Sequence, residues 1–377
     1  MERCLIGGAV TLLLGGMAAS SWTQRGVIGL RQQLQQFVAE VDAQELATQC
    51  RHDAVWGETR EQRARPHYQA AARLQEACSR FCWNDAKGAA MADNRELTGD
   101  ELAALREQWR PVCEAVGEGA HSRDRTLLGG PFPWMQLGWG VSAEVRARLA
   151  EGEELAAVQL WLDVMTMRAD LEESSSGFFW AGHLIDLWDD ARLAKLGDAA
   201  RALLDGGLQL LEHRVDVTPS PTQTIAAYLR PLLDGSRARR GWSLRERLWA
   251  WQSCMDPEHR HLEGFDELIA AAPLLAPPAT SFSARQAQWA QFDASPRSMS
   301  TYVSCRADEG IRDLEKIRRG TLTSMRLLRL AIAFHAGAEL PELLDPFADA
   351  PLRASGDDER MLLVSAGGAK RYVHRVR

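Results

Sequence analysis

Apolar residues recur every three or four positions along most of the chain, which is the period of an amphipathic α-helix. The clearest stripes comprise Leu160, Val164, Met167 and Leu171 in one segment, and Ile311, Leu314, Ile317, Met325, Leu328 and Ile332 in another. The first stripe predicts a helix capped by Ser142, and the second a helix over 307–336 that ends at Gly337. A further helix is expected from Phe178 to Leu211. Successive paired helices predict a mainly α fold of packed helical hairpins.

The pattern changes near the C-terminus, where "LLDPFADAPLR" (343–353) places two prolines within six residues and so cannot continue a helix. Short apolar runs follow in "APLRAS", "RMLLVSA" and "RYVHRVR", separated by "SGDD" and "AGGAK". Such runs between turn-forming residues predict two or three strands of a small antiparallel sheet. Four consecutive regions are therefore expected, namely an N-terminal segment 1–22, a cysteine-containing helical region 23–141, a helical domain 142–337 and a small β tail 338–377.

The first 22 residues have the composition of an export signal. Arg3 precedes an apolar run that extends to Ala19 and is followed by small residues, with cleavage expected after Ala18 or Ser20. The alternative is an uncleaved membrane anchor, because residues 4–22 approach the roughly 20 that span a bilayer. Either outcome predicts an exported protein, in the periplasm or anchored to the inner membrane and facing the periplasm.

Six cysteines follow this segment, and an even number in an exported chain suggests disulfide bonds. They are Cys50, Cys78, Cys82, Cys113, Cys254 and Cys305. The first four are expected to pair among themselves, and Cys254 with Cys305, although the spacing does not fix the connectivity. The sequence contains no CxxC pair, haem-attachment motif or zinc-finger spacing, so neither a metal nor a cofactor is predicted.

The composition disfavours some classes of function, nucleic-acid binding among them. A net charge of −7 disfavours a broad surface for nucleic acid. Forty of the 44 basic residues are arginine, which we interpret, beside abundant alanine and leucine, as a coding bias and not as phosphate binding. Thirteen tryptophans are expected mainly as anchors between helices. The alternative interpretation is a tryptophan-lined cavity that carries an apolar ligand.

Catalytic candidates are few. His183, Asp186 and Asp190 are spaced so that they would share one helix face, where a carboxylate can orient and charge an imidazole. This spacing makes an envelope hydrolase the alternative hypothesis, although no HExxH, GxSxG or phosphate-binding loop accompanies it. His259 and His261 in "EHRH" would point about 200° apart on a helix, so they are not predicted to share a metal ion.

The segment "MRLLRLAIAFHAGAELPELLDPFADAPLRASGDDERMLLVSAGG" (325–368) resembles the tail of a loosely defined group of uncharacterised exported bacterial proteins. This tail, with its "DPF…PLR" turn, is similar to the C-terminal part of the major pseudopilins of type II secretion. The upstream "VQLWLDVMTMRADLEESSSGFFWAGHLIDL" looks like the helical region of the same group, so the resemblance covers 145–377. It implies a helix packed on a small antiparallel sheet. The GFTLxE-type prepilin-peptidase site and the acidic calcium loop of pseudopilins are missing, so neither a pilus subunit nor a calcium site is expected.

These observations together predict a non-enzymatic, exported envelope protein with a structural or protein-interaction role. The expected partners are other envelope proteins and, through residues 1–22, the membrane; nucleic acid is not expected.

Overall fold

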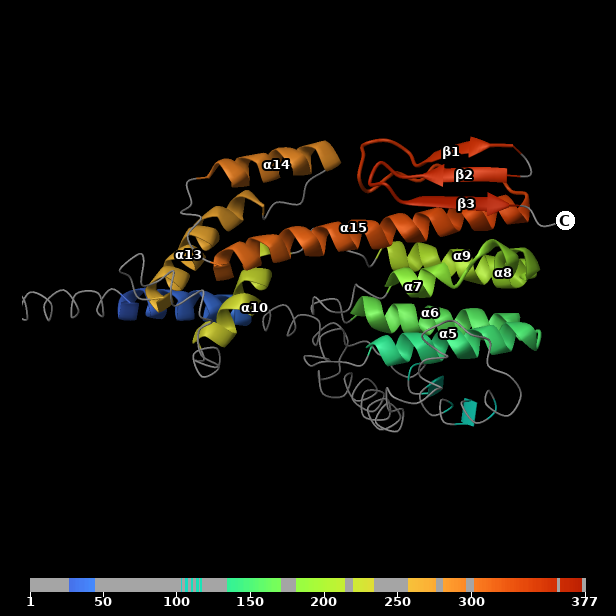
Figure 1. The fold of residues 1–377 in the computed structure, drawn as a ribbon, viewed down its shortest axis with the longest axis horizontal. Coiled ribbons are helices and arrows are strands. Elements are labelled where there is room, and N and C mark those ends of the chain that lie inside the picture. Colours follow the sequence, from blue (N-terminus) through green and yellow to red (C-terminus); the bar gives the residue numbers. More distant parts are fainter. Residues whose placement is uncertain are drawn as a thin grey trace, which may run out of the picture. The chain divides into compact units, whose positions relative to one another are not determined.

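The computed structural model of the protein describes residues 27–44, 134–170, 181–213, 220–233, 257–275, 281–295, 302–357 and 360–374, together with single positions between 103 and 116. These residues are mainly helical, with three short strands near the C-terminus (Figure 1). The predicted fold class is therefore confirmed. Within the described ranges, no helix is both long and apolar enough to cross a membrane. The expected export segment 1–22 lies outside these ranges.

The chain divides into two compact units, each of which collects segments that are distant in sequence. Their residues come from Met1–His52, Thr218–Thr280 and Ala284–Asp313 in the first unit, and from Asp53–Val217, Ser281–Ser283 and Leu314–Arg377 in the second. The four consecutive regions expected from the sequence do not coincide with these units. The expected helical domain 142–337, for example, contributes residues to both units, and α15 (Tyr302–Ala336) is one continuous helix whose residues belong partly to each.

The first unit is built from helices around its own apolar core. Its elements are the helical residues 27–44, α10 (Pro221–Leu233), α13 (Pro257–Ala271), the short 3₁₀ helix η2 (Ala272–Leu274), α14 (Phe282–Ala294) from Ala284 onward and the beginning of α15. Leu34, Phe265 and Phe292 are fully buried in this core. The guanidinium groups of Arg285 and Arg312 lie 5.3 Å and 4.2 Å from the ring centroid of Trp289, at cation–π distance.

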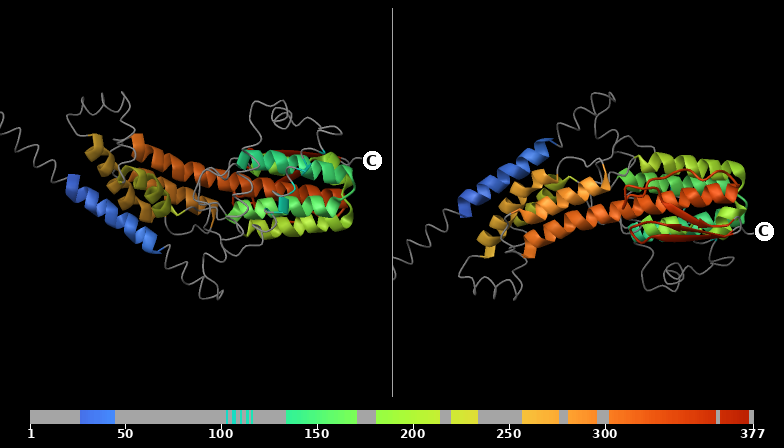
Figure 2. Two further views of the ribbon diagram at one scale, coloured as in Figure 1. Left: turned by 90° about the horizontal axis from the view of Figure 1, so that it is seen from below. Right: turned by 90° about the horizontal axis from the view of Figure 1, so that it is seen from above.

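The second unit contains a helical hairpin of α5 (Trp134–Ala150) and α6 (Glu154–Asp170), and α9 (Asp198–Glu212) packs against α6. Figure 2 shows these green helices alongside the C-terminal part of α15. Trp161 and Trp188 are fully buried and meet edge to face, with ring centroids 5.9 Å apart. The expectation that tryptophans anchor the core holds for these two residues.

Helix α5 begins earlier than expected. Ser142, predicted to cap the helix that carries Leu160, Val164, Met167 and Leu171, lies inside α5, which already starts at Trp134. The expected helix is also two helices, because α5 ends at Ala150 and a new helix, α6, starts at Glu154, ahead of those apolar residues. Two prolines, Pro131 and Pro133, directly precede the start of α5. Proline lacks the backbone N–H and is tolerated only before a helix or in its first turn, so the helix begins immediately after the second proline.

The single helix expected from Phe178 to Leu211 is wrong. The structure has three helices there, α7 (Ala181–Asp186), α8 (Asp190–Lys195) and α9. The Asp189 side chain accepts a hydrogen bond from the backbone N–H of Arg192 (2.9 Å) and so caps a new helix. Gly197 then precedes α9 in an extended conformation, and its N–H donates to Glu154 Oε2 at 2.6 Å.

The C-terminal sheet agrees with the prediction. Strands β1 (Arg353–Gly356), β2 (Arg360–Val364) and β3 (Lys370–His374) pair antiparallel in sequence order. Their buried residues Leu363 and Val373 belong to the same core cluster as Leu328 and Ala331 of α15. The helix ends as predicted at Gly337, whose φ of 66° is readily adopted only by glycine.

The "DPF" motif is a buried polar junction between α15 and the sheet. The Asp345 carboxylate is buried and accepts hydrogen bonds from Phe347 N (2.9 Å), Ser365 Oγ (2.8 Å) and Ala366 N (2.6 Å). Arg319 of α15 donates to the carbonyl of Pro346 at 2.5 Å. The Asp345 carboxylate thus joins the turn at 345–347 to the turn that follows β2.

Candidate functional site

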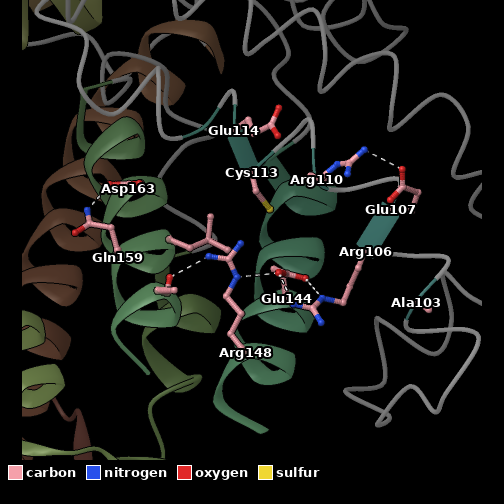
Figure 3. Close-up of a pocket in the computed structure, with 12 residues that line it drawn as sticks. Ala103, Arg106, Glu107, Arg110, Cys113, Glu114, Glu144, Arg148, Gln159 and Asp163 are labelled. Carbon is pink, nitrogen blue, oxygen red and sulfur yellow. Dashed lines mark hydrogen bonds and ion pairs between the residues drawn. The ribbon is translucent and has the colours of Figure 1, made fainter. Parts of the chain in front are cut away.

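The second unit contains a pocket of about 680 Å³ between α5, α6 and the described positions between 103 and 116 (Figure 3). Its volume is in the range of small-molecule binding sites. Charged and polar side chains predominate among the lining residues, which are Ala103, Arg106, Glu107, Arg110, Cys113, Glu114, Glu144, Arg148, Ala156, Gln159, Leu160 and Asp163.

Glu144 is the centre of the pocket's ionic network. Its side chain is 8% exposed and lies between two arginines. Arg106 donates through Nε to Oε2 (2.9 Å) and through Nη2 to Oε1 (3.2 Å), and Arg148 Nε donates to Oε1 at 2.8 Å. Arg106 also contacts Glu151 at 2.5 Å. The hydrogen bond with Glu144 raises the pKa of Arg106, so this guanidinium stays charged at any physiological pH.

The remaining polar residues lie towards the edges of the pocket. Gln159 donates to Asp163 Oδ1 at 2.7 Å on α6, and Arg110 pairs with Glu107 at 2.9 Å. The last two side chains are 65% and 70% exposed, so their pair contributes little to stability. Glu114 is exposed, and Figure 3 shows its carboxylate directed away from the Glu144 network.

Cys113 carries a free thiol on the lining of the pocket. Burial raises its pKa to about 12, and the nearby Glu144 carboxylate adds to this increase. The thiol therefore remains protonated near neutral pH, whereas a nucleophile or metal ligand must be a thiolate. The pocket thus has the features of a binding site and lacks an activated nucleophile among its described residues.

The disulfide prediction can be followed only at Cys113. Cys50, Cys78, Cys82 and Cys254 lie outside the described residues, and so does the side chain of Cys305, although its backbone belongs to α15. The free thiol of Cys113 shows no pairing, but every partner expected for it lies outside the described residues. The connectivity stays a prediction.

The predicted catalytic face of His183, Asp186 and Asp190 does not exist as one helix face. The first two residues belong to α7, which ends at Asp186, while Asp190 begins α8. The His183 side chain lies outside the described set, and Asp186 is exposed. The physical cause is the cap at Asp189, which starts a new helix and so changes the direction in which the following residues point.

Asp190 instead faces a different histidine. Its Oδ1 lies 3.6 Å from Nε2 of His335, a residue near the end of α15. The His335 side chain is 3% exposed. Burial lowers the pKa of His335, an effect that Asp190 partly offsets and that the cations of Arg201 and Arg371 reinforce. Burial also lowers the pKa of Arg371, which donates to the carbonyl of Trp188. This cluster connects α8, α15 and β3.

Among the described side chains, no group of three or more His, Cys, Asp or Glu residues is arranged to hold a metal ion. His259 and His261 fall in helix α13, and their side chains are not among those described.

Only two of the residues that line the pocket were singled out from the sequence, Cys113 as a disulfide candidate and Leu160 as part of an apolar stripe, and no pocket was predicted. Local spacing contains part of the signal, because Glu144–Arg148 and Gln159–Asp163 are i,i+4 pairs and Glu107–Arg110 is an i,i+3 pair. Comparison of the chain with protein-family models, curated proteins and solved structures found no match.

Proposed function

We propose that this protein is exported to the bacterial cell envelope and acts there by binding another protein, without catalysing a reaction. The single observation that supports the binding role best is the state of the pocket. Its three arginines are all engaged with carboxylates, and its thiol is held protonated by burial. Such groups are suited to recognition and are poorly placed for nucleophilic or acid–base chemistry.

The location rests on the sequence of residues 1–22, where Arg3 and the apolar run to Ala19 form the expected export signal. Cleavage after Ala18 or Ser20 would leave the packed helix 27–44 intact. A retained anchor would be joined to that helix by a few residues only and would hold the first unit at the periplasmic side of the inner membrane. Both outcomes are compatible with the buried Leu34.

The two alternatives have less support. The hydrolase hypothesis required His183, Asp186 and Asp190 on one helix face, and that premise is wrong. The carrier hypothesis required a tryptophan-lined cavity, whereas Trp161 and Trp188 pack against each other and the described pocket is lined by charged side chains. The resemblance to pseudopilin tails agrees with an envelope role and remains a prediction.

An alkaline phosphatase fusion at the C-terminus tests the location, because this reporter is active only outside the cytoplasm. We expect an active fusion in a Gram-negative host, and an inactive fusion when the apolar run is interrupted by two aspartates. An inactive wild-type fusion would contradict export.

Photo-crosslinking in the same host tests the binding role. A benzoylphenylalanine at position 114, on the pocket, should give a discrete crosslinked protein band. The same residue at position 342, which is exposed and outside the pocket, should give none. Equal patterns at both positions would argue against a role of the pocket in protein binding.

A further inference from the structure

Helix α8 is short and is held by polar contacts with three other elements. It has six residues, and a helix of this length is not stable by itself in water. Arg201 of α9 donates from Nε and Nη2 to two carbonyls in the last turn of α8, at 3.3 Å and 3.1 Å. Arg371 of β3 donates to the carbonyl of Trp188, two residues before the helix. The third contact comes from His335 of α15.

The His335 imidazole occupies an environment that suits its neutral form. Its side chain is 3% exposed, and the 3.6 Å between its Nε2 and Asp190 Oδ1 is longer than a hydrogen bond. This buried nitrogen has no hydrogen-bond partner among the described residues. The ring of Phe334 meets the imidazole edge to face, with centroids 5.9 Å apart. A charge placed on the imidazole would be buried without a hydrogen bond to stabilise it, which is costly.

The charges that act on His335 come from the same three elements. Arg201 on α9 and Arg371 on β3 are cations, and Asp190 on α8 is a carboxylate. Burial is the main cause that lowers the pKa of His335, Asp190 opposes this effect, and the two arginines reinforce it. Protonation of His335 would therefore add a third cation to a group that contains one carboxylate.

Two further carboxylates lie near Arg371. Asp186 at the end of α7 and Asp189 at the cap of α8 attract this guanidinium, as Asp190 does. Both residues are exposed, and Asp189 is paired with Arg192 at 2.7 Å. Solvent screens exposed charges, so these two carboxylates offset an added buried charge only weakly.

We propose that residues 181–195, which comprise α7 and α8, form an acid-sensitive latch that opens from α15 and β3 when His335 takes up a proton. Opening lets the imidazolium reach water and separates it from Arg201 and Arg371. The open latch binds the proton with the ordinary affinity of histidine, whereas the closed latch resists it, so acid favours the open form. This conformational response goes beyond the proposed protein-binding role and does not depend on it.

Hydrogen–deuterium exchange of the full chain at pH 7.5 and 5.5 provides the test, with exchange times scaled for the pH dependence of the chemical step. The measured quantity is the ratio of the opening constants of the latch at the two pH values. One proton taken up near pH 6.5 raises this constant at most about tenfold between pH 7.5 and 5.5, and we expect a clear rise towards that limit. Peptides from α14, which contains no histidine, should keep a ratio near one.

Three variants assign the response to the cluster. His335→Gln removes the titrating group, so its latch should have a ratio near one. His213→Gln makes the same chemical change at an exposed histidine and should keep the ratio of the wild-type protein. Arg371→Gln removes one of the two cations that act on the imidazole, so its ratio should be smaller than that of the wild-type protein. The ratio compares two pH values of one variant, so a general loss of stability does not imitate these results.

The latch would be overturned by a ratio near one in the wild-type protein, or by a ratio in His335→Gln that equals the wild-type value. An equal rise in the α14 peptides would also reject it, because the whole chain and not the latch would then be opening. A larger ratio in Arg371→Gln would contradict the electrostatic cause. The phosphatase fusion and the crosslinking judge the proposed function separately, because neither depends on the exchange of residues 181–195.

Discussion

Gly206 and Gly207 are neighbours in α9, yet only Gly207 faces another helix closely. A Cβ atom added to Gly207 would lie 2.3 Å from Cδ2 and 2.5 Å from Cδ1 of Leu162 on α6, whereas a Cβ added to Gly206 would meet nothing within 4 Å. Carbon atoms in van der Waals contact are about 3.5 to 4.0 Å apart. Alanine at these two positions therefore makes the same chemical change in opposite surroundings.

The expected free energies follow from two contributions. Replacing glycine by alanine inside a helix stabilises it by about 0.5 to 1 kcal/mol, and Gly206→Ala should show this gain. Gly207→Ala gains the same amount but must displace the buried Leu162 side chain, and overpacking of a core costs about 1 to 3 kcal/mol. The free energies of unfolding of the two variants should therefore differ by about 1 to 3 kcal/mol, with Gly207→Ala the less stable.

Urea unfolding followed by circular dichroism measures this difference, and hydrogen–deuterium exchange of peptides from α6 and α9 assigns it to the second unit. Equal stability of the two variants, or a more stable Gly207→Ala, would refute the close packing of α6 on α9.

Three further predictions concern buried polar groups. Asp345→Ala should lower the free energy of unfolding by about 3 to 5 kcal/mol, because three donors lose their acceptor; thermal unfolding measures it, with the exposed Asp198→Ala as the control. Burial lowers the pKa of His335, so the unfolded chain binds this proton first and stability should fall as the pH drops below about 6.5. His335→Gln should remove this part of the pH dependence of stability. If the urea midpoint of the variant changes between pH 7.5 and 5.5 as much as that of the wild-type protein, the prediction is contradicted. Cys113, with a pKa of about 12, should react with a maleimide at least tenfold more slowly than free cysteine at pH 7.5, and equally fast labelling would contradict its burial.

Periodicity predicted the elements whose apolar face is long and continuous. Leu160 and Val164 of α6 are buried as expected, and so are Leu328 and Ile332 of α15. The C-terminal sheet was predictable because prolines and glycines separate its short apolar runs. In these segments the local pattern and the tertiary packing favour the same structure, so the sequence alone is sufficient to predict it.

The region from Phe178 to Leu211 shows where periodicity fails. Its apolar spacing fits one helix, yet Asp189 and Gly197 provide the start of two new helices. The side chain of Glu154 accepts a hydrogen bond from the N–H of Gly197 across 43 residues, and this contact cannot be read from local spacing. The predicted catalytic face was lost for the same reason, because it assumed a helix that caps interrupt.

The abundance of arginine, interpreted above as a coding bias, also has a structural use that the sequence alone does not show. Arg329 bonds Asp205 through Nε (2.8 Å) and Glu212 through Nη1 (2.9 Å), and so joins α15 to α9 at two points. A lysine offers one compact ammonium and cannot reproduce this fork geometry. Arg106 uses the same fork towards Glu144 and Glu151. Because the guanidinium groups of the pocket are occupied by carboxylates, a surplus of arginine in the composition does not make the pocket a cluster of unpaired cations.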